Sequence, residues 1–231
     1  MMSSSPGLLR SLALFDGLDP SSLALLEERV RARVFREGEI IFRRDDVGTA
    51  LYVIRSGRVK IRLTADDGRE TVLALLGPGA CFGELAVLDG EPRSADAVAV
   101  DRTETVMLLR DDFLRALDQS AVLAKRMILL ISQKLRQTNE QLYDLVFYDV
   151  PGRVAKRLLE LAATHGVRSP VGTQIDISLT QQDLAQLIGA SRESVNRALR
   201  SYVARGFIAV AHQRIVILKP EGLRRQLGSA G

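Results

Sequence analysis

The sequence predicts an α+β fold with three successive parts: an N-terminal antiparallel β-roll or jelly roll, a long helix, and a C-terminal winged helix-turn-helix. In the first part, glycines recur about every ten residues between short alternating runs, which is typical of an antiparallel sandwich. In the second part, residues 118–148 contain neither glycine nor proline and keep a helical apolar period. In the third part, two short helical patterns flank Gly189. We expect an N-terminal domain at residues 1–117, a long helix and hinge at residues 118–149, and a C-terminal domain at residues 150–231.

The composition is typical of a globular chain of one or two domains. The chain has 231 residues, of which 46% are hydrophobic, enough for a buried core. No apolar run approaches the length of a membrane span, and acidic residues occur too early for a signal peptide, so we expect a cytoplasmic protein with no membrane partner. The single cysteine, Cys81, excludes an internal disulfide. Because the only histidines are His165 and His212, we also expect no metal site.

Charge is distributed unevenly along the chain. Residues 151–231 contain 12 Lys and Arg against 5 Asp and Glu, a net charge of +7, whereas residues 1–150 contain 20 against 23, a net charge of −3. A basic C-terminal part on an acidic body is expected where one domain contacts phosphates. The basic part coincides with the helix-turn-helix pattern, which strengthens both observations.

The N-terminal part combines a leucine-rich segment with a β-rich one. Residues 8–30 have a helical pattern that Gly17 and Pro20 interrupt. Over residues 34–109 the pattern changes to short alternating strands, which argues against a βαβ unit. The sequence Asp66-Asp67-Gly68 predicts a hairpin turn between two of these strands.

The predicted long helix carries an apolar seam in alternating steps of three and four residues. The seam consists of Ile128, Ile131, Leu135, Thr138, Leu142 and Leu145. Such a seam predicts a two-stranded coiled coil between two copies of the chain; the alternative is a helix packed on its own β-domain. Thr138 is the only polar residue in the seam. The sequence Asp149-Val150-Pro151-Gly152 is expected to end the helix and to form a hinge before a new helix over residues 153–163.

Residues 178–210 have the pattern of a helix-turn-helix followed by a β-wing. Thr180 and Ser191 are expected N-caps, and Gly189 supplies a turn residue without a Cβ penalty. The inward residues are expected to be Leu184, Ala185 and Ile188 on the first helix and Val195, Leu199 and Val203 on the second. Residues 207–210 and 214–218 are expected wing strands, and residues 220–231 a helical or frayed tail.

The outward face of the second helix carries side chains of the kind that read the edges of DNA bases. These side chains are Arg192, Glu193, Asn196, Arg197 and Arg200. The alternative is an ordinary helical hairpin with a solvated charged face. The turn glycine, the two N-caps and the outward-facing arginines together favour DNA binding.

A second chemical pattern, FGELAVLDGEPRSA over residues 82–95, predicts an anion pocket. Gly83 permits a backbone N–H to approach an anion closely, Arg93 offers a planar fork for two phosphate oxygens, and Ser94 adds a hydroxyl donor. Glu84 only accepts hydrogen bonds, so it suits a sugar hydroxyl. Together these residue types predict a site for a ribose phosphate; the alternative is a structural Arg–Glu pair in a β-turn.

Over residues 10–220 the order of parts and the motifs resemble the cyclic-AMP receptor protein/FNR family of bacterial transcription regulators. FGELAVLDGEPRSA resembles the family's phosphate-binding cassette, and QTNEQLYDLVFYDVPGR resembles the end of its dimer helix and its hinge. TQQDLAQLIGASRESVNRALR resembles its DNA-reading unit. The resemblance implies a cyclic-nucleotide-binding β-roll, a dimerisation helix and a homodimeric activator that responds to cyclic AMP and binds double-stranded DNA.

The resemblance assigns nucleotide contacts residue by residue. In the cassette, Gly83, Arg93 and Ser94 match the residues that hold the cyclic phosphate, Glu84 matches the acceptor for the ribose 2′-hydroxyl, and Leu85 adjoins it. On the long helix, Thr138 matches the residue that meets the adenine of its own subunit. Asn139, where the family often has Ser, matches the residue that reaches the partner's nucleotide, and Lys134 stands where the cyclic-AMP branch often has Arg.

The resemblance also assigns DNA contacts. Arg192, Glu193 and Arg197 match base-contacting positions, and Thr180 and Gln182 match phosphate-contacting ones. The rest of the predicted DNA-facing set is Ser191, Asn196 and Arg200. The resemblance further suggests a two-fold symmetric site with half-sites similar to TGTGA.

The same residues argue against several other functions. An enzyme is not expected, because two histidines offer no base–nucleophile–orienter set. An iron–sulfur sensor needs several cysteines, and a haem sensor needs a ligand in the β-domain or dimer helix, whereas both histidines lie C-terminal to them. The remaining alternative is a regulator of the same family that binds DNA without a nucleotide. The loop over residues 165–174 is either a contact for RNA polymerase or a plain solvent loop.

Overall fold

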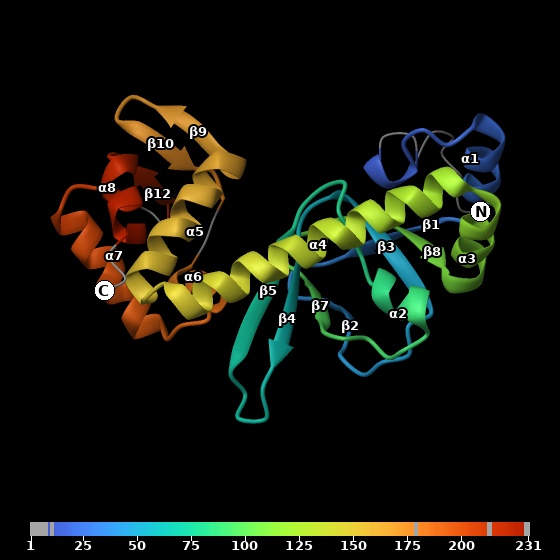
Figure 1. Cartoon of the computed structure of the whole chain (residues 1–231), viewed down its shortest axis with the longest axis horizontal. Coiled ribbons are helices and arrows are strands. Elements are labelled where there is room, and N and C mark those ends of the chain that lie inside the picture. The colour runs from blue at the N-terminus through green and yellow to red at the C-terminus, as the bar shows by residue number, and fades with distance from the viewer. Residues whose placement is uncertain (1–8, 10–11, 178–179, 212–213, 229–231) are drawn as a thin grey trace. The chain divides into compact units, whose positions relative to one another are not determined.

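The computed structural model describes residues 9, 12–177, 180–211 and 214–228 (Figure 1). The expectations for Leu8, Ser178, Leu179 and His212, and for the tail from residue 229, therefore concern positions outside the described residues. The chain forms two compact units, which are described separately. The first comprises residues 1–69 and 73–136, and the second residues 70–72 and 137–231.

The first unit holds the strands of the β-roll together with the helices before, between and after them. Its elements are η1 (Ala13–Phe15), α1 (Pro20–Glu27), β1 (Arg31–Phe35), β2 (Ile40–Phe42), β3 (Ala50–Ser56), β4 (Val59–Thr64), β5 (Glu70–Leu76), β6 (Cys81–Phe82), α2 (Glu84–Asp89), β7 (Asp96–Ala99), β8 (Thr103–Leu109), α3 (Arg110–Gln119) and the start of α4 (Ala121–Phe147). The strands lie in two four-stranded sheets with the orders β1-β8-β3-β6 and β2-β7-β4-β5. Because neighbouring strands are mostly not consecutive in sequence, the chain crosses between the sheets, and the predicted β-roll is confirmed.

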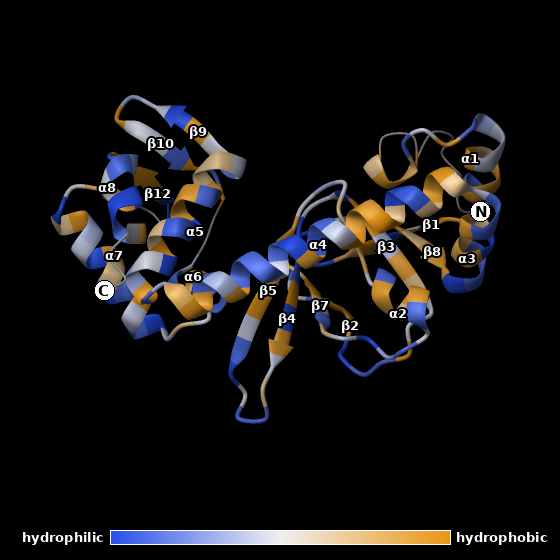
Figure 2. Ribbon diagram, in the orientation of Figure 1, coloured by the Kyte–Doolittle hydropathy of each residue, from blue (hydrophilic) through white to orange (hydrophobic). Residues whose placement is uncertain are grey.

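The main core of the first unit lies between β3, β8 and the helices. Leu51 and Val53 of β3 face Leu108 of β8, and Leu123 and Met127 of α4 pack on the same cluster. Figure 2 shows apolar residues along the strands and the first turns of α4, and hydrophilic residues at the β4–β5 turn. Within the described ranges, no helix is both long and apolar enough to cross a membrane.

The N-terminal segment differs from its expected pattern. Pro20 was expected to interrupt a helix, but it begins α1, because proline is tolerated in the first turn, where no intrahelical acceptor waits for its missing N–H. The Asp19 carboxylate caps this turn by accepting from the backbone N–H of Ser21 and Ser22 at 3.1 and 2.9 Å. Helix α1 therefore starts where the sequence pattern was taken to break.

The turn at Asp66-Asp67-Gly68 is confirmed. The Gly68 N–H donates to the Ala65 carbonyl oxygen at 2.9 Å, and the Ala65 N–H donates to that of Arg69 at 2.9 Å. Gly68 has a φ of 81°, in the left-handed region that favours glycine.

The long helix begins later than its sequence pattern suggested. It was expected from residue 118, but α3 ends at Gln119 and α4 begins at Ala121. Between them Ser120 is extended, with φ −133° and ψ 100°, and its hydroxyl accepts from the Leu123 N–H at 3.3 Å. A serine that can cap a helix therefore divides a stretch that has no glycine or proline to mark the break.

Helix α4 has two apolar faces. One packs on its own β-domain, and the other carries the exposed part of the predicted seam. Met127 is buried, and Ile131 of the predicted seam packs partly against the core of its own domain. Other seam residues are left open to solvent: Ile128 is 65% exposed, Leu135 60% and Leu142 55%. The predicted seam is therefore only partly covered by the chain's own core.

The second unit contains the remaining elements. They are α5 (Val150–His165), β9 (Gly166–Ser169), β10 (Gly172–Ile175), α6 (Gln181–Ile188), α7 (Arg192–Ala204), β11 (Ile208–Ala211), β12 (Arg214–Ile217), α8 (Pro220–Arg224) and η2 (Arg225–Gly228). The strands form one sheet in the order β11-β12-β10-β9. Strands β11 and β12 are the predicted wing, displaced from the expected bounds by one residue.

The break between α4 and α5 is shorter than the expected hinge. Asp149 caps α5 by accepting from the Gly152 N–H at 2.7 Å, so Pro151 and Gly152 belong to the first turn of α5 rather than to a linker. The helix begins at Val150 instead of residue 153. The physical reason is again that a first helical turn accepts proline when an aspartate precedes it.

The loop expected over residues 165–174 is instead a β-hairpin. Strands β9 and β10 pair with Gly172 opposite Ser169, and β10 also pairs with β12 through Thr173 opposite Ile217. Strand β9 begins at Gly166 and β10 at Gly172, with Pro170 between them, so glycine and proline hide the alternation of these strands in the sequence. Pairing with β12 supplies the third strand that a short hairpin needs for stability.

The second helix of the helix-turn-helix buries a different residue from the one expected. Val195 and Leu199 are buried as predicted, but Val203 is 45% exposed. Tyr202 fills the interior instead, at 1% exposure, and its hydroxyl donates to the Pro151 carbonyl oxygen at 2.6 Å. Desolvation raises the pKa of Tyr202, so the hydroxyl stays protonated and remains a donor.

Removing the Tyr202 hydroxyl is expected to destabilise the second unit. In Tyr202→Phe the Pro151 carbonyl loses its donor, at a cost of about 1 kcal/mol in the free energy of unfolding. Scanning calorimetry of the whole chain should show a lower Tm for the transition of this unit. Tyr143→Phe is the matched control, because Tyr143 is 49% exposed. Equal Tm values for the two variants would contradict the proposed contribution of the bond.

Candidate functional site

The residues of the predicted anion pocket form a tight strand–turn–helix. Strand β6 ends at Phe82, Gly83 adopts φ 75° and ψ 11°, and α2 follows at once. The left-handed conformation favours glycine. A Cβ at Gly83 would also lie 2.6 Å from Nη1 of Arg93, so the position has no room for a side chain.

Arg93 is buried beneath this turn, with 4% of its surface exposed. Its Nη1 donates to the Gly83 carbonyl oxygen and its Nη2 to that of Ala50, each at 2.6 Å. The guanidinium lies 4.1 Å from the ring centroid of Phe42. Burial is the main cause of a lowered pKa for Arg93, but an arginine starts so high that it remains charged near neutral pH.

The backbone of Arg93 is held as firmly as its side chain. Its N–H donates to the Asp46 carbonyl oxygen, and its carbonyl oxygen accepts from the Asp45 N–H, both at 2.9 Å. Asp45 has a φ of 67°, a conformation that aspartate tolerates better than most residues. The loop between β2 and β3 therefore fixes the position of Arg93.

Glu84 is also buried, at 3% exposure, and is paired with the long helix. Lys134 of α4 donates to Glu84 Oε1 at 2.8 Å and to the Cys81 carbonyl oxygen at 2.9 Å. The lysine side chain is 35% exposed, whereas the glutamate side chain is 4% exposed. One ammonium thus joins the first turn of α2 and the end of β6 to α4.

The alternative of a structural Arg–Glu pair is wrong. The hydrogen bonds of Arg93 go to backbone carbonyls, and the ion pair of Glu84 goes to Lys134. Neither arginine nor glutamate is the other's hydrogen-bond or ion-pair partner.

The remaining predicted nucleotide residues lie at the edge of the cassette or further along α4. Ser94 follows the buried Arg93 and is exposed, and Leu85 is 44% exposed. Thr138 and Asn139 lie on α4, about one helical turn beyond Lys134, and both are exposed. The structure thus brings Gly83, Glu84, Arg93 and Lys134 together and leaves the other four side chains at the surface of their elements.

The cassette fits an anion with a hydroxyl group beside it. The Nε–H of Arg93 is buried without a hydrogen-bond partner among the described residues, an arrangement that is costly unless an acceptor is supplied. Formal charges of Arg93, Lys134 and Glu84 leave one positive charge, which matches a singly charged phosphodiester. Carboxylate oxygens of Glu84 provide acceptors of the kind that a sugar hydroxyl needs.

Neither reactive sulfur nor a metal cluster is found beside this cassette. Cys81 is a free, buried cysteine, and burial raises the pKa of its thiol far above neutral pH. Across the residues that the structure describes, no group of three or more His, Cys, Asp and Glu side chains is placed to hold a metal ion.

The helix-turn-helix has the caps and turn that the sequence predicted. Thr180 and Asp183 form a capping box at the start of α6, with the threonine hydroxyl accepting from the Asp183 N–H at 3.1 Å. Gly189 ends α6 with a φ of 67°. Ser191 caps α7 by accepting from the Ser194 N–H at 3.2 Å. The hydroxyls of Thr180 and Ser191 therefore have structural partners.

Helix α7 presents most of the predicted DNA-reading side chains to solvent. Arg192, Glu193, Arg197 and Arg200 are exposed, and so is Gln182 on α6. Asn196 differs from the expectation: it is half-buried, and its Oδ1 is buried without a hydrogen-bond partner among the described residues. It lies one position after the buried Val195, at the border between the inward and outward faces.

Sequence reasoning missed the supports of the cassette. Ala50 supplies a backbone carbonyl, which no side-chain motif reveals. Phe42 belongs to an aromatic group with Tyr52 and Phe82, in which the Tyr52 and Phe82 rings stack 5.2 Å apart. The available signal was that β2, β3 and β6 each carry one aromatic residue. That signal did not identify a partner for Arg93.

Comparisons with known proteins agree with this geometry. The cyclic nucleotide-binding domain family model matches residues 32–120, and the Crp-like helix-turn-helix domain model matches residues 152–226. The chain is 37% identical to a CRP-like cAMP-activated global transcriptional regulator of Mycobacterium tuberculosis, over 95% of this chain and 98% of that protein. It is 36% identical to a cyclic AMP receptor protein of Thermus thermophilus, over 87% and 89%.

A solved structure has the same fold. It is the c-di-GMP responsive global regulator CLP of Xanthomonas campestris, with a TM-score of 0.76 and 26% identity, over 86% of this chain and 99% of that chain. The family to which these relatives belong consists of transcription regulators, not enzymes. The chain belongs to the cyclic-AMP receptor protein/FNR family of DNA-binding transcription regulators and carries that family's cyclic nucleotide-binding domain.

Proposed function

We propose that this protein is a homodimeric transcription activator whose binding to two-fold symmetric DNA sites responds to cyclic AMP. The observation that carries the proposal is the buried cassette, in which Arg93 has an unpartnered N–H and Glu84 is tied to α4 through Lys134. We further propose a division of labour in which residues 1–117 bind nucleotide, residues 118–149 dimerise and form the hinge, and residues 150–231 bind DNA. The protein would act in the cytoplasm.

Cyclic AMP is the proposed effector because its chemistry matches the donor set. Gly83, Arg93 and Ser94 would hold the cyclic phosphate, Glu84 would accept from the ribose 2′-hydroxyl, and Leu85 would adjoin the sugar. The names of the relatives from M. tuberculosis and T. thermophilus support this nucleotide. The name of the X. campestris relative gives c-di-GMP as its effector, so the choice of nucleotide must be tested for this chain.

Selectivity for adenine is assigned to α4. Thr138 would meet the base of its own subunit, and Asn139 would reach the nucleotide held by the partner. Lys134 would hold Glu84 oriented toward the ribose, because its Nζ donates to Glu84 Oε1 at 2.8 Å.

Dimerisation is supported by the exposed face of α4. Ile128, Leu135 and Leu142 recur at seven-residue intervals, and each is more than half exposed. Leu145 continues the seam at 49% exposure. Pairing two such faces would remove apolar surface from water, which would stabilise the dimer by roughly 25 cal/mol for each Å² buried.

The proposed DNA site follows from the exposed face of α7. Arg192 and Arg197 would each face a guanine O6/N7 pair, and Glu193 would accept from a cytosine N4. Thr180 and Gln182, at the start of α6, would contact phosphates, with Ser191, Asn196 and Arg200 completing the surface. A dimer would place its half-sites, similar to TGTGA, about one helical turn apart.

Coupling between α4 and α7 has a continuous physical basis in the second unit. Lys156 of α5 donates to Asp144 of α4 at 2.5 Å, and its ammonium lies 3.4 Å from Glu140. The start of α5 is in turn bonded to α7 through Pro151 and Tyr202. A displacement of α4 would therefore be passed to α7. For a switch, cyclic AMP must bind the DNA-competent state better than the other state.

RNA polymerase is the proposed second macromolecular partner. The β9–β10 hairpin offers Val167 and Val171, which are 44% and 66% exposed, beside the exposed Arg168. We assign the polymerase contact to this hairpin, because exposed apolar residues that lie together mark interaction sites. The alternative function is a family member that binds DNA without a nucleotide, with the cassette retained as a structural element.

Glu84→Ala is expected to weaken cyclic AMP binding about tenfold or more, because a charged acceptor is lost from the ribose. The same substitution should barely change the affinity for 2′-deoxy cyclic AMP, which has no 2′-hydroxyl. Calorimetry on both proteins with both ligands measures how much of the lost affinity depends on the 2′-hydroxyl. Glu91→Ala is the matched control, since Glu91 is an exposed acid of the same cassette. Equal losses of affinity for the two ligands would show that Glu84 does not contact the ribose 2′-hydroxyl. If the native protein did not bind cyclic AMP, the alternative function would be favoured.

Leu135→Lys should shift the protein toward the monomer and abolish DNA binding, because a charge would enter the apolar seam. Sedimentation equilibrium measures the oligomeric state, and a gel-shift titration measures DNA binding. Gln133→Lys introduces the same charge at an exposed position off the seam and should remain dimeric. A native protein that is monomeric at micromolar concentration would contradict the proposal.

Arg192→Ala should cost about 1–3 kcal/mol of binding free energy and relax the base preference at one position. Gln182→Ala should weaken binding to all sequences alike, because a phosphate contact carries no base information. Affinities for a panel of single-base variants of the site distinguish the two patterns. Arg224→Ala is the control for loss of a charge at an exposed position of the same unit. A uniform loss in Arg192→Ala would make Arg192 a phosphate contact instead.

A further inference from the structure

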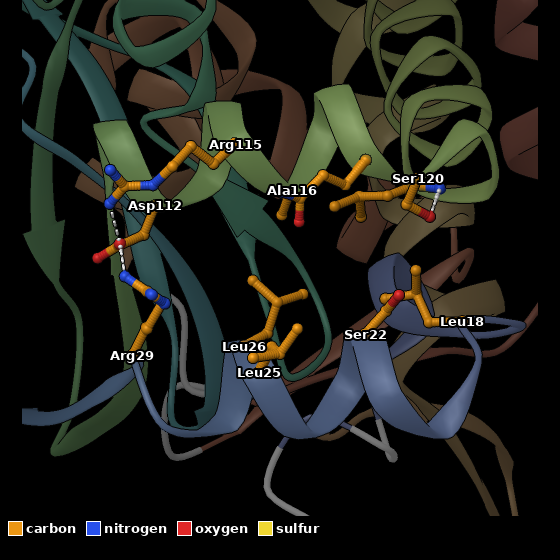
Figure 3. Close-up of a pocket in the computed structure, with 11 residues that line it drawn as sticks. Leu18, Ser22, Leu25, Leu26, Arg29, Asp112, Arg115, Ala116 and Ser120 are labelled. Atoms are coloured by element: carbon orange, nitrogen blue, oxygen red, sulfur yellow. Dashed lines mark hydrogen bonds and ion pairs between the residues drawn. The ribbon is translucent and has the colours of Figure 1, made fainter.

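A cavity of about 180 Å³ lies away from the nucleotide cassette, between α1, α3 and the start of α4 (Figure 3). The proposed function uses none of its lining residues. Sites for drug-sized ligands are typically about 300–1,000 Å³, so this cavity suits a molecule of only a few heavy atoms.

The cavity is charged at one end. Asp112 Oδ1 accepts from Arg29 Nη1 at 2.7 Å and from Arg115 Nη2 at 2.6 Å. Figure 3 shows these three side chains together at one end of the cavity. Two guanidinium groups around one carboxylate leave a net charge of +1 there.

These guanidinium groups have unused hydrogen-bonding capacity. Each has five N–H donors, and each uses one of them on Asp112. To the described residues, their side chains make no other hydrogen bond. The side chains are 49% and 62% exposed for Arg29 and Arg115, so they can turn toward a ligand without losing a packed position.

Five of the other eight lining residues are apolar, and the three polar ones are Ser22, Gln119 and Ser120. Leu25 and Leu26 of α1 face Ala116 of α3, and Leu18 and Ser22 lie toward the end opposite the arginines (Figure 3). Leu26 is buried, but Leu25 is 53% exposed although it lines the cavity. An apolar wall next to a cationic end matches a molecule with an apolar tail and an anionic head.

We propose that this cavity is a second ligand site, which binds a small carboxylate with a short aliphatic tail. The carboxylate would accept charge-assisted hydrogen bonds from Arg29 and Arg115, and the tail would lie between Leu25 and Ala116. Because α1 contributes one wall and the α3–α4 junction another, the ligand would hold the N-terminal helix against the start of α4. This inference goes beyond the proposed function and does not depend on cyclic AMP binding.

The test uses hexanoate as the probe and the full chain as the protein. Saturation-transfer NMR should detect binding of hexanoate to the native protein, and hexylamine, which has the opposite charge, should give a much weaker signal. Arg115→Gln and Leu25→Gln change the head and tail contacts at half-exposed positions, so both variants are expected to fold. Each should weaken hexanoate about two- to fivefold, the size expected for one exposed interaction.

The control is Arg102→Gln, which removes an arginine from a single exposed ion pair, Arg102 to Glu104 at 2.7 Å, elsewhere in the same unit. It should leave hexanoate binding unchanged. Absence of hexanoate binding would overturn the proposal, as would equal binding of hexylamine by the native protein. Retention of the native affinity in both Arg115→Gln and Leu25→Gln would also overturn it, because the ligand would then lie elsewhere.

Discussion

A buried guanidinium at Arg93 is the constraint on which the rest of the nucleotide-binding domain depends. A charge that is removed from water must find acceptors, and the carbonyl oxygens of Gly83 and Ala50 provide them. This requirement fixes the turn after β6, the glycine that the turn needs, and the loop that pins the arginine backbone through Asp46. These hydrogen bonds give the cassette one defined geometry around Arg93.

The same domain is connected to the long helix by a second buried charge. Glu84 reaches Lys134, and so the cassette and α4 are joined by one ion pair. On α4, residues such as Met127 pack inward, while Leu135 remains uncovered on another face. A single helix thus serves as part of the domain core, as a support for the ligand site and as the proposed dimer surface. A ligand that contacts Glu84 would therefore act on the helix that carries the proposed dimer surface.

Much of the architecture could be predicted from the sequence because local chemistry determined it. Thr180, Gly189 and Ser191 cap and turn the helix-turn-helix as expected, and Gly68 forms its hairpin turn. The predictions were wrong where contacts between residues distant in sequence determine which side chain is buried. Tyr202 replaces Val203 in the interior because its hydroxyl reaches the Pro151 carbonyl oxygen.

The same limit applies to the short hairpin and to the candidate site. Strands β9 and β10 are stabilised by their pairing with β12, a contact distant in sequence. In the cassette, Gly83, Glu84, Arg93 and Ser94 were identified by residue type and spacing. The carbonyl of Ala50 and the ring of Phe42 were not, because a backbone acceptor and a distant aromatic residue leave no motif.

The central claim is that nucleotide and DNA bind to the same state of the protein. Linkage requires that each then strengthens the other by the same factor. Calorimetric titration of cyclic AMP into the free protein, and into the protein saturated with a symmetric TGTGA-type duplex, measures that factor. The account predicts a higher affinity for cyclic AMP in the DNA complex. Equal affinities in the two titrations would contradict it.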